Sequence, residues 1–171
     1  TDGLGGSMKR EKALEIMKDS RIGSFGTLSL IIALGGKISL LTLLGQQDII
    51  LACLALFGAH ISSRFTPLFL IRFQSHVGDA AGSKSKPLSD AISWPTFSVG
   101  TIWWLASLIL LHFLYPDVPW WGAVVGTTIT LIWMFRLLAR RLEGFTGDGL
   151  GATQQICEIG FYLGLLLVMQ T

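Results

Sequence analysis

Two short, acidic, glycine-rich stretches stand near the two ends of this 171-residue chain. The first, TDGLGG, carries Asp2, and the second, GFTGDGLGA, carries Asp148; both are expected to be loops. Glycines leave room for a carboxylate to approach an ion and allow positive φ. Magnesium prefers few carboxylates together with water or phosphate oxygens. Asp2 and Asp148 are therefore predicted to hold Mg²⁺ and to take part in catalysis.

Basic residues accompany both acidic stretches and point to phosphate chemistry. Cations beside metal-held carboxylates can clamp phosphates and offset the charge that develops during phosphoryl transfer. The side chains predicted to bind substrate phosphates are Arg10, Lys18, Arg21, Arg64 and Arg140. A plainer interpretation stays open, in which Asp148 caps a helix, Asp2 ends a loop and the cations anchor the chain to lipid headgroups.

The composition places these residues in a membrane protein. Hydrophobic residues make up 51% of the chain and charged residues 14%, whereas soluble domains carry about 25% charged residues. The mean hydropathy is +0.60. A net charge of only +2 argues against a nucleic-acid partner.

Five stretches are long and apolar enough to cross a bilayer, which requires roughly 20 residues per helix. They are Phe25–Leu44, Ile49–Leu70, Phe97–Tyr115, Trp120–Leu138 and Leu150–Met169. The expected fold class is all-α, a polytopic transmembrane helical bundle. Residues 1–171 are expected to form a single integral-membrane domain with membrane lipid around it.

The distribution of positive charge predicts the topology. All Lys and Arg residues except Lys37 fall in the segments 9–21, 64–86 and 136–141. The connections around Asp48 and Asp117 contain none. The positive-inside rule places the basic segments in the cytoplasm, and five alternating spans put the same segments on one side. Both acidic stretches are therefore predicted to face the cytoplasm.

The segment SMKREKALEIMKDSRIG, which precedes the first span, has the pattern of an amphipathic helix. Ser7 is the expected N-cap and Gly23 the expected stop. We expect this helix to lie on the cytoplasmic surface of the membrane.

Charged residues inside the predicted spans need a partner or a cavity, because a charge at the bilayer centre costs about 2.5–3.5 kcal/mol on insertion scales. Glu158 is expected to support Asp148 from one or two helical turns away. Lys37 has no partner that the sequence identifies. Arg64 lies nearer the cytoplasmic end of its span, where snorkelling is an alternative to a role in the site.

Two stretches resemble the signature segments of one enzyme family. DGLGGSMKREKALEIMKDSRIGSFG, from Asp2 to Gly26, and RRLEGFTGDGLGATQQICE, from Arg140 to Glu158, are similar to segments of the adenosylcobinamide-GDP ribazoletransferases, or cobalamin synthases. SSRF at Ser62–Phe65 and the residues Gly82–Lys84 match more loosely. The family pattern has further aspartates and membrane helices upstream of Asp2. The resemblance therefore implies that residues 1–171 correspond to its C-terminal part.

The resemblance implies a Mg²⁺-dependent phosphotransferase of the bacterial inner membrane. The ribose 3′-hydroxyl of α-ribazole, or of its 5′-phosphate, attacks the cobinamide-proximal phosphate of adenosylcobinamide-GDP. GMP leaves, and adenosylcobalamin or its 5′-phosphate forms, late in vitamin B12 biosynthesis. By this resemblance Asp2 and Asp148 are metal ligands, and Asp19 is a ligand or a base for the hydroxyl. A homo-oligomer is compatible with the sequence.

Two other functions remain as alternatives. A CDP-alcohol phosphotransferase also uses an Asp-Gly aspartate cluster beside membrane helices, but Asp2-Gly3 is not followed by Ala-Arg at the place that this family requires. A transporter or structural membrane subunit would use the acidic stretches to bind cations or partners without chemistry.

Overall fold

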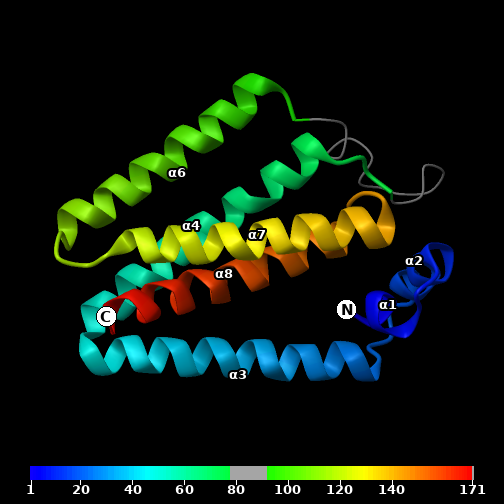
Figure 1. The fold of residues 1–171 in the computed structure, drawn as a ribbon, viewed down its shortest axis with the longest axis horizontal. Helices are drawn as coiled ribbons and strands as arrows, with labels where there is room; N and C mark the ends of the chain where they lie inside the picture. The colour runs from blue at the N-terminus through cyan, green and yellow to red at the C-terminus, as the bar shows by residue number, and fades with distance from the viewer. Residues whose placement is uncertain (78–91, 171) are drawn as a thin grey trace.

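The computed structural model of the chain describes residues 1–77 and 92–170. Within them it contains two short helices, α1 (Asp2–Gly6) and α2 (Arg10–Lys18), followed by long ones (Figure 1). The long helices are α3 (Ser24–Gln47), α4 (Ile49–Phe73), α6 (Trp94–Leu114), α7 (Trp120–Leu142) and α8 (Gly147–Met169). The all-α fold class is confirmed. The Gly82–Lys84 resemblance lies outside the described residues.

The long helices coincide with the predicted spans to within a few residues at each end. All five are long and apolar enough to cross a membrane. Large apolar side chains cover their outer faces; Trp103 is 72% exposed and Phe113 is 77% exposed. Such a surface is stable in lipid and not in water. The chain is an integral membrane protein.

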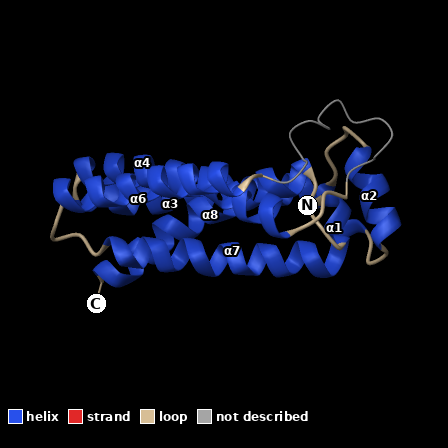
Figure 2. Ribbon diagram, turned by 90° about the horizontal axis from the view of Figure 1, so that it is seen from above, coloured by secondary structure: helices blue, strands red, loops and turns tan. Residues whose placement is uncertain are grey.

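The helices run up and down, so that the described parts of the basic segments, residues 9–21, 64–72 and 136–141, lie towards one end of the bundle. Figures 1 and 2 both place α1 and α2 at the end where α7 finishes and α8 begins. At the opposite end, the Tyr115 hydroxyl donates to the Asp48 carboxylate and the Trp120 indole donates to the Tyr115 carbonyl. We call the end with α1 and α2 the basic end. That it faces the cytoplasm stays a prediction from the charge pattern.

The interior of the bundle has two apolar clusters with polar residues between them. One cluster lies towards the end opposite the basic end and includes Leu51, Phe161 and Leu165. The other lies at the basic end and includes Leu138 and Leu142. Buried polar side chains occupy the intervening turns of α4, α7 and α8, namely Ser62, Ser63, Thr66, Thr127, Thr153 and Glu158. In a membrane bundle such groups require partners inside the protein.

Glycines allow α7 and α8 to pack unusually close together. Gly122 and Gly126 on α7 face Gly160 and Gly164 on α8, and a Cβ at Gly126 would overlap the Gly160 carbonyl. Small residues four apart let two membrane helices approach backbone to backbone, where dispersion replaces the missing hydrophobic driving force. This pair therefore forms the centre of the bundle.

Asp2 and Asp148 both lie in helices, which corrects the expectation of loops at these two residues, whereas residues 144–146 of the second stretch do form the connection between α7 and α8. Asp2 begins α1, and Asp148 lies in the first turn of α8. Thr146 caps α8 by accepting a hydrogen bond from the Gly149 amide at 3.1 Å. The expectation of loops rested on the glycine content, because glycine lowers helix propensity.

The limits of α2 also differ from the prediction. Ser7 is not its N-cap, because the helix begins at Arg10 and Lys9 holds the cap position. The Ser7 hydroxyl instead accepts from the Lys9 amide at 3.1 Å. Gly23 does not stop α2, which ends at Lys18, but stands at the N-cap of α3.

We predict that Gly126→Ala destabilises the protein by about 1–3 kcal/mol, because the added methyl forces α7 away from α8. The measurement is thermal unfolding of the purified protein in detergent. Gly35→Ala is the matched control, since a Cβ at Gly35 meets no atom within 4 Å. Equal melting temperatures for the two variants would contradict the close crossing.

Candidate functional site

The two signature segments pack against each other at the basic end. One guanidinium nitrogen of Arg141 donates to the carbonyls of Leu4 at 2.9 Å and Ser7 at 2.7 Å. The Arg10 Nε donates to the Leu142 carbonyl at 2.7 Å. Leu142 also belongs to the same apolar cluster as Ala13 of α2. The segment with Asp2 is therefore bound to the segment that leads to Asp148.

Asp2 caps the N-terminus of α3. Its two carboxylate oxygens accept hydrogen bonds from the amides of Gly26 at 2.8 Å and Gly23 at 2.9 Å. Amides in the first turn of a helix have no partner within the helix. The bond from Gly26, followed by that from Gly23, lowers the pKa of Asp2. A Cβ at either glycine would overlap the carboxylate, so glycine is required at both positions.

Asp148, unlike Asp2, has an exposed carboxylate that accepts no hydrogen bond from the described residues. It is exposed in the first turn of α8, and the structure gives it no hydrogen bond or ion pair within residues 1–77 and 92–170. The neighbouring Gly147 and Gly151 have no atom within 4 Å of the place of a Cβ. Space next to Asp148 is therefore available for a ligand.

Asp19 and Arg21 form an exposed ion pair between α2 and α3. The Arg21 guanidinium donates to both carboxylate oxygens of Asp19 at 2.8–3.1 Å. This pairing lowers the pKa of Asp19. The carboxylate is consequently a weaker base than an isolated aspartate, and part of the Arg21 fork is already engaged.

The other predicted phosphate-binding cations occupy different surroundings. Arg10 holds the end of α7 and lies 3.6 Å from the Glu143 carboxylate. Arg64 donates to the Gln154 side chain at 3.4 Å. Lys18 is exposed at the end of α2. Arg140 is exposed on α7 beside an apolar groove.

The donor set at the basic end fits Mg²⁺ only in company with a phosphate ligand. The described part of the chain contains no group of three or more His, Cys, Asp or Glu residues that could hold a metal ion. Asp148 has no partner among the described residues, and each Asp2 oxygen retains a lone pair beyond its amide bond. One or two carboxylates completed by substrate phosphates and water are typical of Mg²⁺ sites.

A buried ion pair joins α3 to α8 within the membrane-spanning region. Lys37 Nζ donates to the Glu158 carboxylate at 2.5 Å and to the Gln155 side chain at 2.5 Å. The Ser63 hydroxyl on α4 donates to the other Glu158 oxygen at 3.1 Å. The Lys37 side chain is 15% exposed and that of Glu158 6% exposed. Both charges are thus paired and hydrogen-bonded, as their burial requires.

The positions of Lys37 and Glu158 along their helices indicate this pair, although neither residue reveals its partner when it is considered alone. Lys37 is the fourteenth residue of α3, and Glu158 is the twelfth of α8. Both helices start at the basic end, so the two residues lie at similar depth. Glu158 follows Asp148 by ten residues, or about 15 Å of helix. It is therefore farther from Asp148 than the expected one or two turns.

One face of α8 connects Asp148 with this ion pair. Asp148, Gly151 and Gln155 are exposed and recur at three- and four-residue intervals, which places them on one side of the helix. Gln155 itself contacts Lys37. The basic end therefore continues into the bundle as a polar strip along α8.

The family model described as cobalamin-5-phosphate synthase matches residues 1–166. The chain belongs to the cobalamin-5-phosphate synthase family. It is 48% identical to an adenosylcobinamide-GDP ribazoletransferase of Albidiferax ferrireducens over 96% of this chain and 64% of the relative. It is 42% identical to one of Vibrio cholerae over 99% of this chain and 62% of the relative.

The cobalamin-5-phosphate synthase match covers both signature segments together with all the helices between them. An adenosylcobinamide-GDP ribazoletransferase of a Polaromonas species is 49% identical, and the match covers 63% of its length. The chain thus spans slightly less than two thirds of these curated relatives. No solved structure matches it.

We predict that Lys37→Met destabilises the protein by about 3–5 kcal/mol, because it leaves the Glu158 carboxylate buried without its cation. The double variant Lys37→Met with Glu158→Gln should recover part of this loss. Unfolding of the four proteins of this cycle in detergent measures the coupling. Lys12→Met, at an exposed lysine, controls for the charge change. If the changes in unfolding free energy of the two single variants simply add in the double variant, Lys37 and Glu158 do not interact.

We predict that Asp2→Asn increases hydrogen exchange of the Gly23 and Gly26 amides at neutral pH, because asparagine offers one acceptor oxygen where the carboxylate offers two. The folded-state pKa of Asp2 is lowered from 3.8. The stabilisation of the α3 N-terminus by ionised Asp2 is therefore fully present above this value, and it is lost as the pH falls through the lower folded pKa.

The difference in protection between wild type and Asp2→Asn, corrected for intrinsic exchange rates, should consequently shrink in acid. Asp19→Asn serves as control, because its carboxylate does not contact these amides. Unchanged protection in Asp2→Asn at pH 7 would show that the cap contributes nothing.

Proposed function

We propose that this chain forms the bundle and part of the active site of an adenosylcobinamide-GDP ribazoletransferase. The supporting observation is the docking of its two signature segments at one end of the bundle, through Arg141 and Arg10. The names of the curated relatives supply the substrates, adenosylcobinamide-GDP and ribazole. In this proposal the basic end lies at the cytoplasmic surface of the bacterial inner membrane, which the positive-inside rule supports.

The reaction proposed is a displacement at phosphorus. The ribose 3′-hydroxyl of α-ribazole, or of its 5′-phosphate, forms a bond to the cobinamide-proximal phosphorus. The bond from that phosphorus to the GMP oxygen breaks, and the hydroxyl proton passes to a base. The products are GMP and adenosylcobalamin or its 5′-phosphate.

Asp148 and Asp2 would hold Mg²⁺, which when bound neutralises the diphosphate and the departing GMP. Asp148 contributes the accessible carboxylate of the two. Asp2 is fixed by its bonds to the Gly23 and Gly26 amides, so it holds the start of α3 beside the substrate.

Asp19 is a less favourable base than its position suggests, because Arg21 lowers its pKa. We propose that Asp19 orients Arg21 and that the remaining N–H groups of Arg21 bind a substrate phosphate, as guanidinium groups commonly do. In this arrangement catalysis depends chiefly on positioning and charge.

The test incubates membranes containing the full-length protein with adenosylcobinamide-GDP, α-ribazole 5′-phosphate and Mg²⁺, and follows GMP and the cobalamin product. We expect Asp148→Asn to lower turnover by about 10²-fold or more, the usual loss when a group that stabilises developing charge is removed. Asp117→Asn, an exposed aspartate of the opposite end, should retain activity.

Wild-type membranes that release neither product would overturn the proposed function. Full turnover by Asp148→Asn would leave the activity standing but reject the role of this carboxylate.

A further inference from the structure

An apolar groove runs along the outer face of α7 and has arginines at the end that lies nearer the basic end. Its volume is about 510 Å³, and Ile129, Ile132 and Trp133 form its apolar part. Arg136 and Arg140 line it one helical turn apart, towards the basic end. Ile129 is 62% exposed and Trp133 52% exposed, so this face looks outward from the bundle.

The two arginines carry charge that the described residues do not neutralise. Arg136 and Arg140 are exposed and make no hydrogen bond or ion pair with residues 1–77 or 92–170. The adjacent Arg141 differs, because its guanidinium binds the Leu4 and Ser7 carbonyls. The nearby Glu143 carboxylate lies beside Arg10. Two guanidinium groups that have no partner among the described residues therefore lie at the border of an apolar surface.

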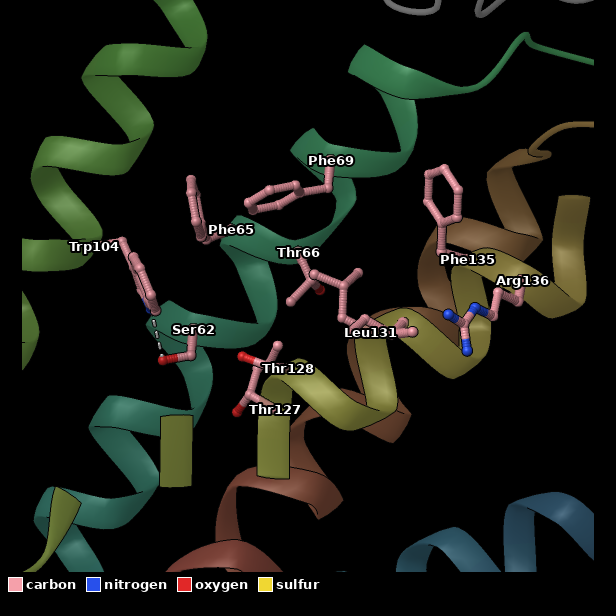
Figure 3. A pocket seen from close by; sticks show the side chains of 11 residues that line it. Ser62, Phe65, Thr66, Phe69, Trp104, Thr127, Thr128, Leu131, Phe135 and Arg136 are labelled. Carbon is pink, nitrogen blue, oxygen red and sulfur yellow. Dashed lines mark hydrogen bonds between the residues drawn. The ribbon is translucent and has the colours of Figure 1, made fainter. Parts of the chain in front are cut away.

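A second cavity, of about 270 Å³, lies on the other side of Arg136, between α4, α6 and α7. Figure 3 shows Arg136 at one end of this cavity, and Ser62 with Trp104 at the other. Between them lie aromatic rings that include Phe65, Phe69 and Phe135. Ile132 and Arg136 line both cavities. Arg136 thus stands on a ridge between two apolar grooves.

We propose that this surface binds one anionic diacyl phospholipid, with its phosphate on Arg136 and Arg140 and an acyl chain in each groove. Guanidinium groups bind phosphate through paired hydrogen bonds, and basic pockets on the cytoplasmic side of spanning helices bind anionic headgroups. The proposal does not depend on the proposed enzymatic activity.

A lipid is favoured over a soluble phosphate compound because of what surrounds the arginines. Both grooves follow α7 from Arg136 towards the middle of a membrane-spanning helix, and their walls are mainly aliphatic and aromatic. A soluble phosphate would leave these walls in contact with bulk lipid and would use only the guanidinium groups. An amphiphile uses both features at once.

The test adds dioleoyl phosphatidylglycerol or dioleoyl phosphatidylcholine to the full-length protein in detergent and counts bound lipids by native mass spectrometry. We expect tighter binding of phosphatidylglycerol. Arg136→Gln should weaken it about fivefold, and Arg136→Gln with Arg140→Gln about 25-fold, as expected for one surface arginine each. The control is Lys9→Gln with Lys12→Gln, which removes two exposed charges from α2 at the same end.

A second arm tests the grooves with the arginines intact. Ile132 lines both grooves, so Ile132→Trp places a larger side chain in them and should also weaken phosphatidylglycerol binding. Arg136→Lys keeps the positive charge and should retain part of the binding. Thermal melting of each variant verifies folding.

Four results would overturn the proposal. These are equal retention of the two lipids, no effect of Arg136→Gln, an equal loss in the Lys9 and Lys12 control, or displacement of the lipid by inorganic phosphate. The last would indicate a site for a soluble phosphate compound. An unchanged phosphatidylglycerol affinity in Ile132→Trp would also overturn the proposal, because it would show that the acyl chains bind outside the two grooves.

Discussion

The rest of the structure depends on the close approach of α7 and α8. Apolar side chains gain little by leaving lipid for a protein interior, so a membrane bundle is held together by tight packing and internal polar contacts. At Gly126 and Gly160 the two backbones touch. This contact fixes the direction of both helices and hence the position of the turn between them. Arg141 and Asp148 lie on either side of that turn.

From this centre, two independent connections reach Asp2. The first passes through Arg141 of α7, which binds the carbonyls of Leu4 and Ser7. The second passes through α8, whose Glu158 holds Lys37 of α3, and α3 in turn donates its first amides to Asp2. Because both connections consist of helices and short charged contacts, Asp2 and Asp148 are supported by rigid elements.

The sequence predicted the helices well and the contacts poorly, for a physical reason. Hydropathy reports the bilayer, which acts on every residue of a span, so the five spans followed from composition, while the orientation that the charge asymmetry predicts stays a prediction. The Lys37–Glu158 pair, the Asp2 cap and the Arg141 contacts join residues more than 20 positions apart. Such pairs depend on which helices are neighbours, and a single sequence does not contain that information. The expectation that Asp2 and Asp148 lie in loops was wrong because glycine here allows close packing and helix capping as well as loops.

Helix termini hold the two carboxylates of the proposed site, since Asp2 and Asp148 each lie in the first turn of a helix. A loop would leave the two carboxylates free to repel each other, whereas helix termini set their positions before a ligand arrives. The positive end of the α3 dipole faces Asp2 and that of α8 lies beside Asp148, which lowers the cost of holding two negative charges at one surface. In the proposed function, a cation between an anionic diphosphate and these carboxylates would offset the repulsion between their negative charges. Helix dipoles directed at the acids would weaken the binding of a cationic ligand alone, so this arrangement suits the proposed chemistry, in which an anionic phosphate accompanies the cation, better than a site for cations only.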